Sequence, residues 1–211
     1  MSAQGAHKIT EDFEKELCRY TGSPYAVAID NQSNALFLAL EFLNLEKGTA
    51  ITIPERTYPS VPCEIIRAGH KVKFKECKTE YLKGAYQLSP TNVIDSALRF
   101  TKDMYIPGTS MCISFTGPFK HLKLSKGGAI LTDNKEAYEW FKRKRFSGRR
   151  EMSYHEDQLD MLGYNCYMMP EIAARGLLLI SQFYDGNGNP KENEDLELKY
   201  PKLSDFPIYT Q

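Results

Sequence analysis

The sequence has few cysteines and no pattern among them. Five cysteines are scattered over 211 residues without CxxC spacing. A scattered, odd set of this kind favours reduced thiols over a disulfide framework or a zinc site. We therefore expect a cytoplasmic protein without a metal centre.

An excess of one charge and long apolar runs are also missing. Lys+Arg and Asp+Glu both number 27, so the formal net charge is zero. Nothing in this balance indicates binding to nucleic acid or to an anionic membrane. Apolar runs such as GLLLI at 176–180 are far shorter than the roughly 20 residues of a membrane span. The polar start of the chain, MSAQGAHKITEDF, lacks the apolar region of a signal peptide.

Short apolar runs alternate with amphipathic segments along most of the chain. Thr10, Ser33 and Asn134 are candidate helix caps, and Gly22, Gly48 and Gly69 are candidate stops. The segment 79–90 gives only a weak signal, and 147–158 is predicted as loop. The predicted helices are 8–22, 33–48, 60–69 (with Ile65 and Ile66 inside), 134–146 and 170–184, and the predicted strands are 25–30, 50–54, 71–76, 92–95, 111–115 and 129–132.

This alternation predicts an α/β fold with a mostly parallel central sheet. A chain of 211 residues can bury one core, so one domain is expected. We predict a core over residues 1–185 and an irregular, charged tail over 186–211.

The segment CISFTGPFKHLKLSKGGAILTD, residues 112–133, carries the strongest chemical signal. It places one lysine, Lys120, in a loop between two apolar strands and ahead of a Gly-Gly pair. A partly desolvated lysine can lose its proton and form a Schiff base with a carbonyl. Asp95 ends another apolar run, in NVIDSA. Such a lysine and such an aspartate are the minimum that pyridoxal phosphate (PLP) requires: an imine partner, and a carboxylate to keep the ring nitrogen protonated.

Taken in order, several motifs resemble one known family. They are AIDNQSNALFLAL, PERTYPSVPCEIIRAGHKVKF, VIDSA, SF-x4-K-x6-GGAILTD and LGYNCYMMPEIAARGLLL. Between about Phe13 and Phe183 the chain is similar to the DegT/DnrJ/EryC1/StrS group of PLP-dependent sugar aminotransferases. The resemblance implies a minimal type I PLP-transferase fold, like that of aspartate aminotransferase, with three αβα layers.

The resemblance also implies roles for individual residues. Lys120 would hold PLP as a Schiff base, Asp95 would pair with the pyridine nitrogen, and Tyr58 would stack on the ring. The phosphate would be bound by Ser114, by the backbone N–H groups of Gln32 and Ser33, and by Asn165 of a neighbouring subunit in a homodimer. A helix N-terminus at Gln32 and Ser33 independently suits a phosphate, because it offers free N–H donors.

The chain departs from the family pattern at several positions. Gln32 and Ser33 replace the usual glycine-containing turn, Leu98 stands where Gln or His is common, and Tyr167 replaces an arginine. The family's chains are longer and have a C-terminal small domain. The cofactor core thus matches, while the substrate-facing parts are reduced.

We therefore predict a homodimeric, PLP-dependent aminotransferase that moves an amino group from an amino acid to a keto-sugar, with a nucleotide-linked sugar favoured. The alternatives are a non-catalytic or regulatory protein of this fold, or a PLP enzyme with other chemistry such as sugar dehydration. One branch of the family uses a histidine for dehydration, so His121 is a weaker candidate. Arg149 and Arg150 could clamp a phosphorylated substrate, although a solvated basic helix end explains them equally well.

Overall fold

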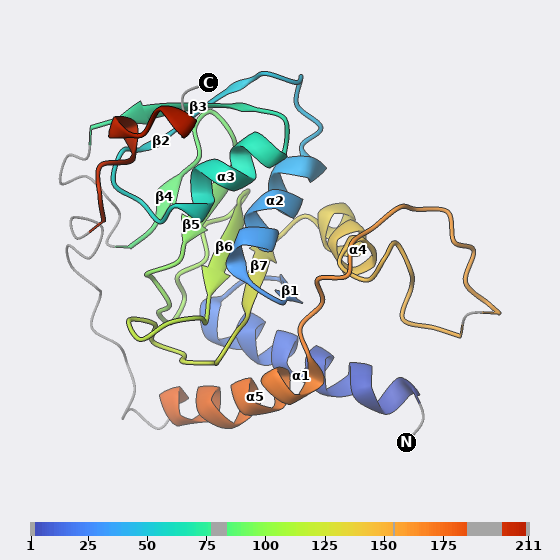
Figure 1. Ribbon diagram of the computed structural model, residues 1–211. Coiled ribbons are helices and arrows are strands. Elements are labelled where there is room, and N and C mark those ends of the chain that lie inside the picture. The colour runs from blue at the N-terminus through green and yellow to red at the C-terminus, as the bar shows by residue number, and fades with distance from the viewer. Residues whose placement is uncertain (1–2, 77–83, 154, 185–199, 210–211) are drawn as a thin grey trace.

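The computed structural model describes residues 3–76, 84–153, 155–184 and 200–209 (Figure 1). The first half contains α1 (Ala3–Thr21), β1 (Tyr25–Ile29), α2 (Gln32–Phe42), β2 (Ala50–Pro54), α3 (Ser60–Arg67) and β3 (Lys71–Lys75). The second half contains β4 (Tyr86–Gln87), β5 (Val93–Ser96), β6 (Ser110–Ser114), β7 (Gly128–Thr132), α4 (Lys135–Lys144), α5 (Pro170–Tyr184) and two short 3-10 helices, η2 (Leu203–Asp205) and η3 (Pro207–Tyr209).

The central sheet has five strands in the order β1-β7-β6-β5-β4. Only β5 and β6 run parallel within it, while β1–β7, β6–β7 and β4–β5 are antiparallel. Strands β2 and β3 form a separate parallel pair. The α/β fold class is confirmed, but the sheet is mixed rather than mostly parallel. The physical reason is that β6 and β7 are joined by a loop instead of a crossover helix, and such a connection returns the chain in the opposite direction.

Helices cover both faces of this sheet, as Figure 1 shows. Alternate residues of β1 and β6 enter two different apolar clusters, because successive strand side chains point to opposite faces. Val27 and Cys112 belong to the cluster beneath α2, α3 and α4. Ala28 and Met111 belong to the cluster beneath α1 and α5. The predicted three-layer architecture is therefore present.

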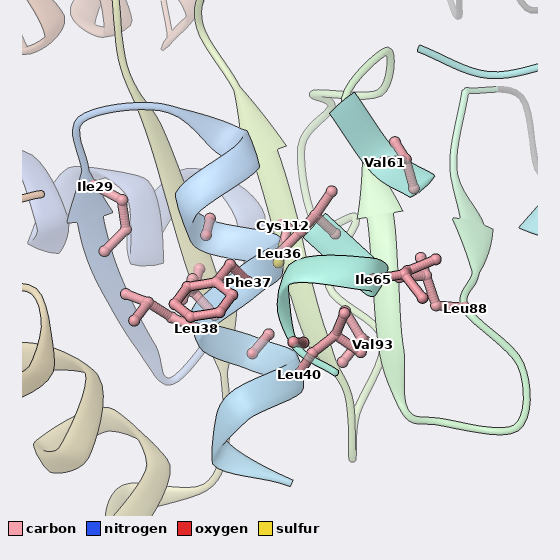
Figure 2. Packing of buried hydrophobic residues seen from close by; sticks show 14 of the residues in the cluster. Ile29, Leu36, Phe37, Leu38, Leu40, Val61, Ile65, Leu88, Val93 and Cys112 are labelled. Atoms are coloured by element: carbon pink, nitrogen blue, oxygen red, sulfur yellow. The ribbon is translucent and has the colours of Figure 1, made fainter. Parts of the chain in front are cut away.

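Helix α2 lies on the sheet, and its interior positions Ala35 through Leu40 are all buried. Figure 2 shows its side chains packed with Ile65 of α3 and Val93 of β5. The cap of α2 is Asn31 rather than the predicted Ser33, since Asn31 has an extended backbone and its side chain accepts from the N–H of Asn34 at 2.8 Å. The helix ends at Phe42, before the predicted stop at Gly48.

The other predicted elements are confirmed with smaller corrections. Helix α1 begins well before Thr10, which is buried inside the helix, and ends at Thr21, directly before the predicted stop at Gly22. Ile65 is buried, whereas Ile66 is 44% exposed. No sequence pattern indicated β4, because a two-residue strand is too short to show a hydrophobic period. Residues 79–83 of that weak segment lie outside the described residues.

A buried ionic cluster joins α1 to the end of α4. The guanidinium of Arg145 is 2% exposed and contacts the carboxylates of Glu14 and Glu151. Lys142 Nζ lies 3.3 Å from Glu14 and 3.0 Å from Glu151. Burial alone would lower the pKa of Arg145, but the two carboxylates outweigh it and raise that pKa. The pKa of Glu151 is lowered, because Arg145 and Lys142 outweigh the opposite effect of burial.

The C-terminal segment 200–209 returns to the loop that follows β2 (Figure 1). The N–H of Leu203 donates to the carbonyl of Glu55 at 2.7 Å, and Arg56 donates to the carbonyl of Tyr200 at 2.8 Å. Leu203 is itself 2% exposed. The predicted division of the chain at residue 185 adjoins the undescribed residues and stays a prediction.

Candidate active site

The candidate site is built around Asp95, a residue of β5 that is 3% exposed. Its Oδ1 accepts from the N–H of Ala97 at 2.8 Å and from Nε2 of Gln32 at 2.5 Å. Its Oδ2 accepts from the hydroxyl of Tyr86 at 2.8 Å. The carboxylate is thus enclosed by protein and satisfied by three donors from separate parts of the chain.

Burial is the largest influence on the protonation of Asp95, and it raises the pKa of this carboxyl. The hydrogen bonds from Tyr86, Ala97 and Gln32 and the nearby charge of Lys120 act in the opposite direction. Cys112, on the neighbouring strand β6, has a pKa raised well above its usual value by burial and by the charge of Asp95. Its thiol is therefore not an available nucleophile near neutral pH.

The structure brings Lys120 to the same place as Asp95. Lys120 Nζ donates to the carbonyl of Ala97 at 2.6 Å, while the N–H of Ala97 binds Asp95. The loop that carries Lys120 is pinned at its base, where the N–H of Phe115 donates to the carbonyl of Gly127 at 3.0 Å. Ala97 therefore contacts both the amine of Lys120 and the carboxylate of Asp95, the two groups that were predicted to act together.

The Gly-Gly pair after this loop is explained by geometry. Gly127 has φ +139°, in a region that side chains rarely adopt. A Cβ on Gly128 would lie 2.7 Å from the backbone nitrogen of Gln32 and 2.8 Å from the carbonyl oxygen of Ile113. Because these side chains are absent, the start of β7 can approach Gln32, the first residue of α2. The start of that helix therefore lies beside the end of β6, where Ser114 pairs with Gly128.

Gln32 and Ser33 form the first turn of α2, where backbone N–H groups and the helix dipole favour an anion. The hydroxyl of Ser33 donates to that of Ser60, at the start of α3, at 2.8 Å. Sequence reasoning assigned only the backbone of Gln32 to the site. The structure adds its side chain, which is buried and reaches Asp95.

Tyr58 and Ser114 lie on segments that border this centre. Tyr58 is 56% exposed, and its ring meets that of Tyr200 edge-on at 6.0 Å between centroids. The residue before it, Thr57, makes a 2.5 Å hydrogen bond with the hydroxyl of Tyr86 and so joins this loop to Asp95. Ser114 is the last residue of β6, and its hydroxyl accepts from the N–H of Thr116 at 3.4 Å.

Asn165 belongs to the segment between α4 and α5. It is exposed, pairs through its backbone with Phe146, and lines a cavity of about 260 Å³ with Asp30, Lys126 and other residues. Tyr167, in the place of the family's arginine, packs edge-on against Phe146 at 5.3 Å between ring centroids.

The weaker substrate candidates are divided between two places. His121 is half-buried next to Lys120, and burial, Lys123 and Lys120 lower its pKa. Arg149 and Arg150 instead line a separate cavity of about 300 Å³ beside α4. Arg150 Nη1 lies 3.1 Å from the carboxylate of Asp157, so acidic side chains already neutralise part of this basic pair.

Two residues at the centre, Tyr86 and Thr57, were missed by sequence reasoning. Tyr86 belongs to the short strand β4, and Thr57 lies in a loop, so no periodic signal distinguishes either.

Within the described ranges, no group of His, Cys, Asp and Glu side chains could hold a metal ion. No described helix has both the length and the apolar character needed to cross a membrane.

Parts of the sequence are similar to known proteins. Residues 4–94 match the model of the DegT/DnrJ/EryC1/StrS aminotransferase family. The chain is also 24% identical over 238 aligned residues to the UDP-4-amino-4,6-dideoxy-N-acetyl-beta-L-altrosamine transaminase of Campylobacter jejuni, covering 94% of this chain and 62% of that protein. The similarity to the DegT/DnrJ/EryC1/StrS aminotransferase family model thus covers a little less than half of the chain.

Solved structures of aminotransferases show the same fold. A family aminotransferase from Brucella abortus superposes with a TM-score of 0.70 at 19% identity, covering 84% of this chain and 59% of that one. The Streptococcus pneumoniae protein Spr1654 in its PLP form superposes with a TM-score of 0.67 at 20% identity, covering 84% and 60%. The chain thus spans about three fifths of the length of these relatives.

Proposed function

We propose that the protein is a PLP-dependent aminotransferase that transfers an amino group from an amino acid to a keto-sugar, with a nucleotide-linked sugar as the acceptor. The observation that carries this proposal is the meeting of Lys120 and Asp95 at Ala97, beside the N-terminus of α2. A lysine amine, a buried carboxylate and an anion-binding helix terminus are the three protein groups that PLP needs. The sugar acceptor is supported by the transaminase relative of Campylobacter jejuni, whose name specifies a UDP-linked amino sugar.

The donor set around Asp95 fits a protonated ring nitrogen. A carboxylate has about four acceptor positions, and three of those of Asp95 are taken by Ala97, Gln32 and Tyr86. One position on Oδ2 therefore remains for another N–H donor. The first turn of α2, with Ser33, would hold the phosphate, and Ser114 at the end of β6 and Tyr58 in the loop after β2 would complete the binding set.

When bound, PLP supplies an aldehyde that carries the amino group and a ring that delocalises electrons from the substrate carbon. Lys120 would hold the cofactor at its aldehyde and, once released, would move a proton to and from the reacting carbon as a general base and acid. Asp95 would keep the ring nitrogen charged by accepting its hydrogen bond.

We also propose a homodimer in which Asn165 of one subunit completes the phosphate site of the other. The exposure of Asn165 supports this arrangement. Two exposed apolar side chains flank it in the chain, Leu162 at 88% and Met169 at 53% exposure, and such side chains favour burial against a partner. A cytoplasmic location is part of the proposal; the described cysteines are free thiols, as expected for a reducing compartment.

Borohydride reduction after incubation with PLP tests the role of Lys120. We expect reduction to fix the cofactor covalently to this residue, with the mass increase located by peptide mass spectrometry. Lys120→Ala should abolish the labelled peptide, whereas Lys123→Ala, which changes an exposed lysine of the same loop, should retain it. Labelling at Lys123 or Lys126 instead would show that the assignment within the loop is wrong.

Colour changes and subunit mixing test the reaction and the dimer. A yellow protein whose colour is discharged by an amino-acid donor and restored by a keto-sugar is a transaminase; a protein that takes up no PLP is not. Mixed Lys120→Ala and Asn165→Ala subunits should regain activity, because one of the two sites in a mixed dimer carries neither change. Failure to regain activity despite demonstrated subunit exchange would contradict the shared site.

A further inference from the structure

Tyr86 is the described residue whose side chain contacts Asp95 from the edge strand β4. The two residues are direct partners in the antiparallel pairing of β4 with β5, so their side chains leave the same face of the sheet. Tyr86 is 8% exposed, and its hydroxyl donates to Oδ2 of Asp95 at 2.8 Å. The contact is thus fixed by strand register as well as by a hydrogen bond.

A second hydroxyl fixes the direction of this hydrogen bond. Thr57 is 2% exposed, and its hydroxyl lies 2.5 Å from that of Tyr86. A tyrosine hydroxyl has one proton, and here that proton is directed at Asp95. Thr57 therefore donates to Tyr86, and the three groups form a chain that runs from Thr57 through Tyr86 to Asp95. Chained donors of this kind strengthen each other in a buried setting.

This chain has a consequence for the free acceptor position on Asp95. Gln32 and Ala97 occupy Oδ1, so Oδ2 is the oxygen left to accept from a bound ring, and Tyr86 already holds one side of it. The other titratable groups facing this carboxylate are Lys120 from the loop after β6 and Cys112 from β6 itself. Of these groups, Tyr86 donates to Oδ2 and is itself held by a hydrogen bond from Thr57.

We propose that Tyr86 is a positioning residue for the aminotransferase reaction: its hydroxyl, held by Thr57, keeps the buried Asp95 carboxylate ionised and directs Oδ2 at the cofactor's ring nitrogen. This inference rests on the proposed PLP function. An ionised carboxylate is the form that accepts from a protonated ring nitrogen and holds its charge. Tyr86 acts on the reaction through Asp95.

The first measurement uses the protein without cofactor. The ionisation of Asp95 is followed by ¹³C NMR of labelled aspartate carboxyl groups, with the signal assigned by its loss in Asp95→Asn. In Tyr86→Phe, which removes only the hydroxyl, the pKa of Asp95 should rise by about one unit, because a hydrogen bond to a charged group has been lost. Tyr105→Phe is the matched control, since it removes a hydroxyl that donates to the carbonyl of Thr109 at 2.9 Å instead. An unchanged Asp95 pKa in Tyr86→Phe would overturn the proposal.

The second measurement uses the PLP-loaded protein. Tyr86→Phe should slow the half-reaction with the amino donor by about tenfold or more at saturating donor, with KM little changed and the pH profile shifted in the same direction as the Asp95 pKa. Thr57→Val keeps the shape of the side chain and removes the hydroxyl that holds Tyr86. It should raise the pKa of Asp95 by less than Tyr86→Phe does. This variant therefore tests the proposal if Tyr86→Phe does not fold. Wild-type protein that takes up no PLP would refute the proposed function, whereas a normal rate and profile in folded Tyr86→Phe would refute only the role of Tyr86.

Discussion

Replacing Asp95 with asparagine should affect stability and catalysis in opposite directions. The substitution keeps the shape of the side chain and removes its charge. The amide oxygen can still accept from Ala97 and Gln32. The new NH₂ group would face the hydroxyl of Tyr86, which can accept as well as donate. The variant therefore leaves no buried polar group without a partner.

The sign of the stability change follows from the pKa of Asp95. Burial raises this pKa above the usual 3.8, so the folded protein holds the proton more tightly than the unfolded chain does. Stability therefore falls as the pH rises from 3.8 towards the pKa in the folded state, and the full penalty is present only above that pKa. Each unit of difference corresponds to about 1.4 kcal/mol. Asp95→Asn lacks this penalty and should therefore be at least as stable as the parent protein above the pKa of Asp95 in the folded state.

Catalysis should change far more, and downwards. Loss of one preorganised electrostatic contact at a reacting centre typically costs about 10²–10³ in rate. We therefore expect the half-reaction of PLP-loaded Asp95→Asn to slow by at least about 100-fold, measured in a single turnover by the change in cofactor absorbance. Asp133→Asn is the control: this exposed carboxylate accepts from the N–H of Gly108 at 2.8 Å, and its loss should change stability by less than about 0.5 kcal/mol.

The free energy of unfolding is measured by urea unfolding, followed by circular dichroism and repeated from about pH 4 to about pH 7. The parent should lose stability relative to Asp95→Asn as the pH rises. If Asp95→Asn is instead less stable by more than about 2 kcal/mol, the carboxylate contributes more through its hydrogen bonds than it loses through burial, and the reasoning fails. An unchanged half-reaction would remove Asp95 from the active site.

Three further predictions concern the scaffold and the site loops. Arg145→Met should lower the free energy of unfolding in urea by about 3–5 kcal/mol, because Glu14 and Glu151 lose their buried guanidinium and are left sharing Lys142. Arg143→Met removes a more exposed ion pair and should cost less than about 1 kcal/mol; equal losses would contradict this. Leu203→Ala should cost about 2–5 kcal/mol and speed hydrogen exchange in residues 55–60, and unchanged exchange there would show that the C-terminal segment does not hold this loop. The pKa of His121 is lowered from 6.5, so the free energy of unfolding should fall as the pH falls below that value. His121→Gln should reduce this dependence of stability on pH. An identical dependence in the variant would argue against a partly buried, neutral imidazole.

The site shows which functional residues a pattern can indicate. Lys120 was predicted because it stands in a loop between two apolar strands, and Asp95 because it ends a short apolar run; each has a side chain with distinctive chemistry. The structure places Asp95 within β5. The Gly-Gly pair was likewise visible, and the structure explains it by the close approach of Gly128 to Gln32. Tyr86 and Thr57 could not be found in this way, because their roles depend on strand pairing and on a contact between residues 29 positions apart.

The sequence by itself determined most helices and strands, because hydrophobic periodicity and capping residues act over a few positions. It also determined the two groups proposed for the chemistry. Only the tertiary structure decided the direction of the strands, the use of Asn31 rather than Ser33 as the cap of α2, and the contact of the Gln32 side chain with Asp95. These features depend on where distant segments meet, and burial of a carboxylate among three donors arises only once those segments have packed.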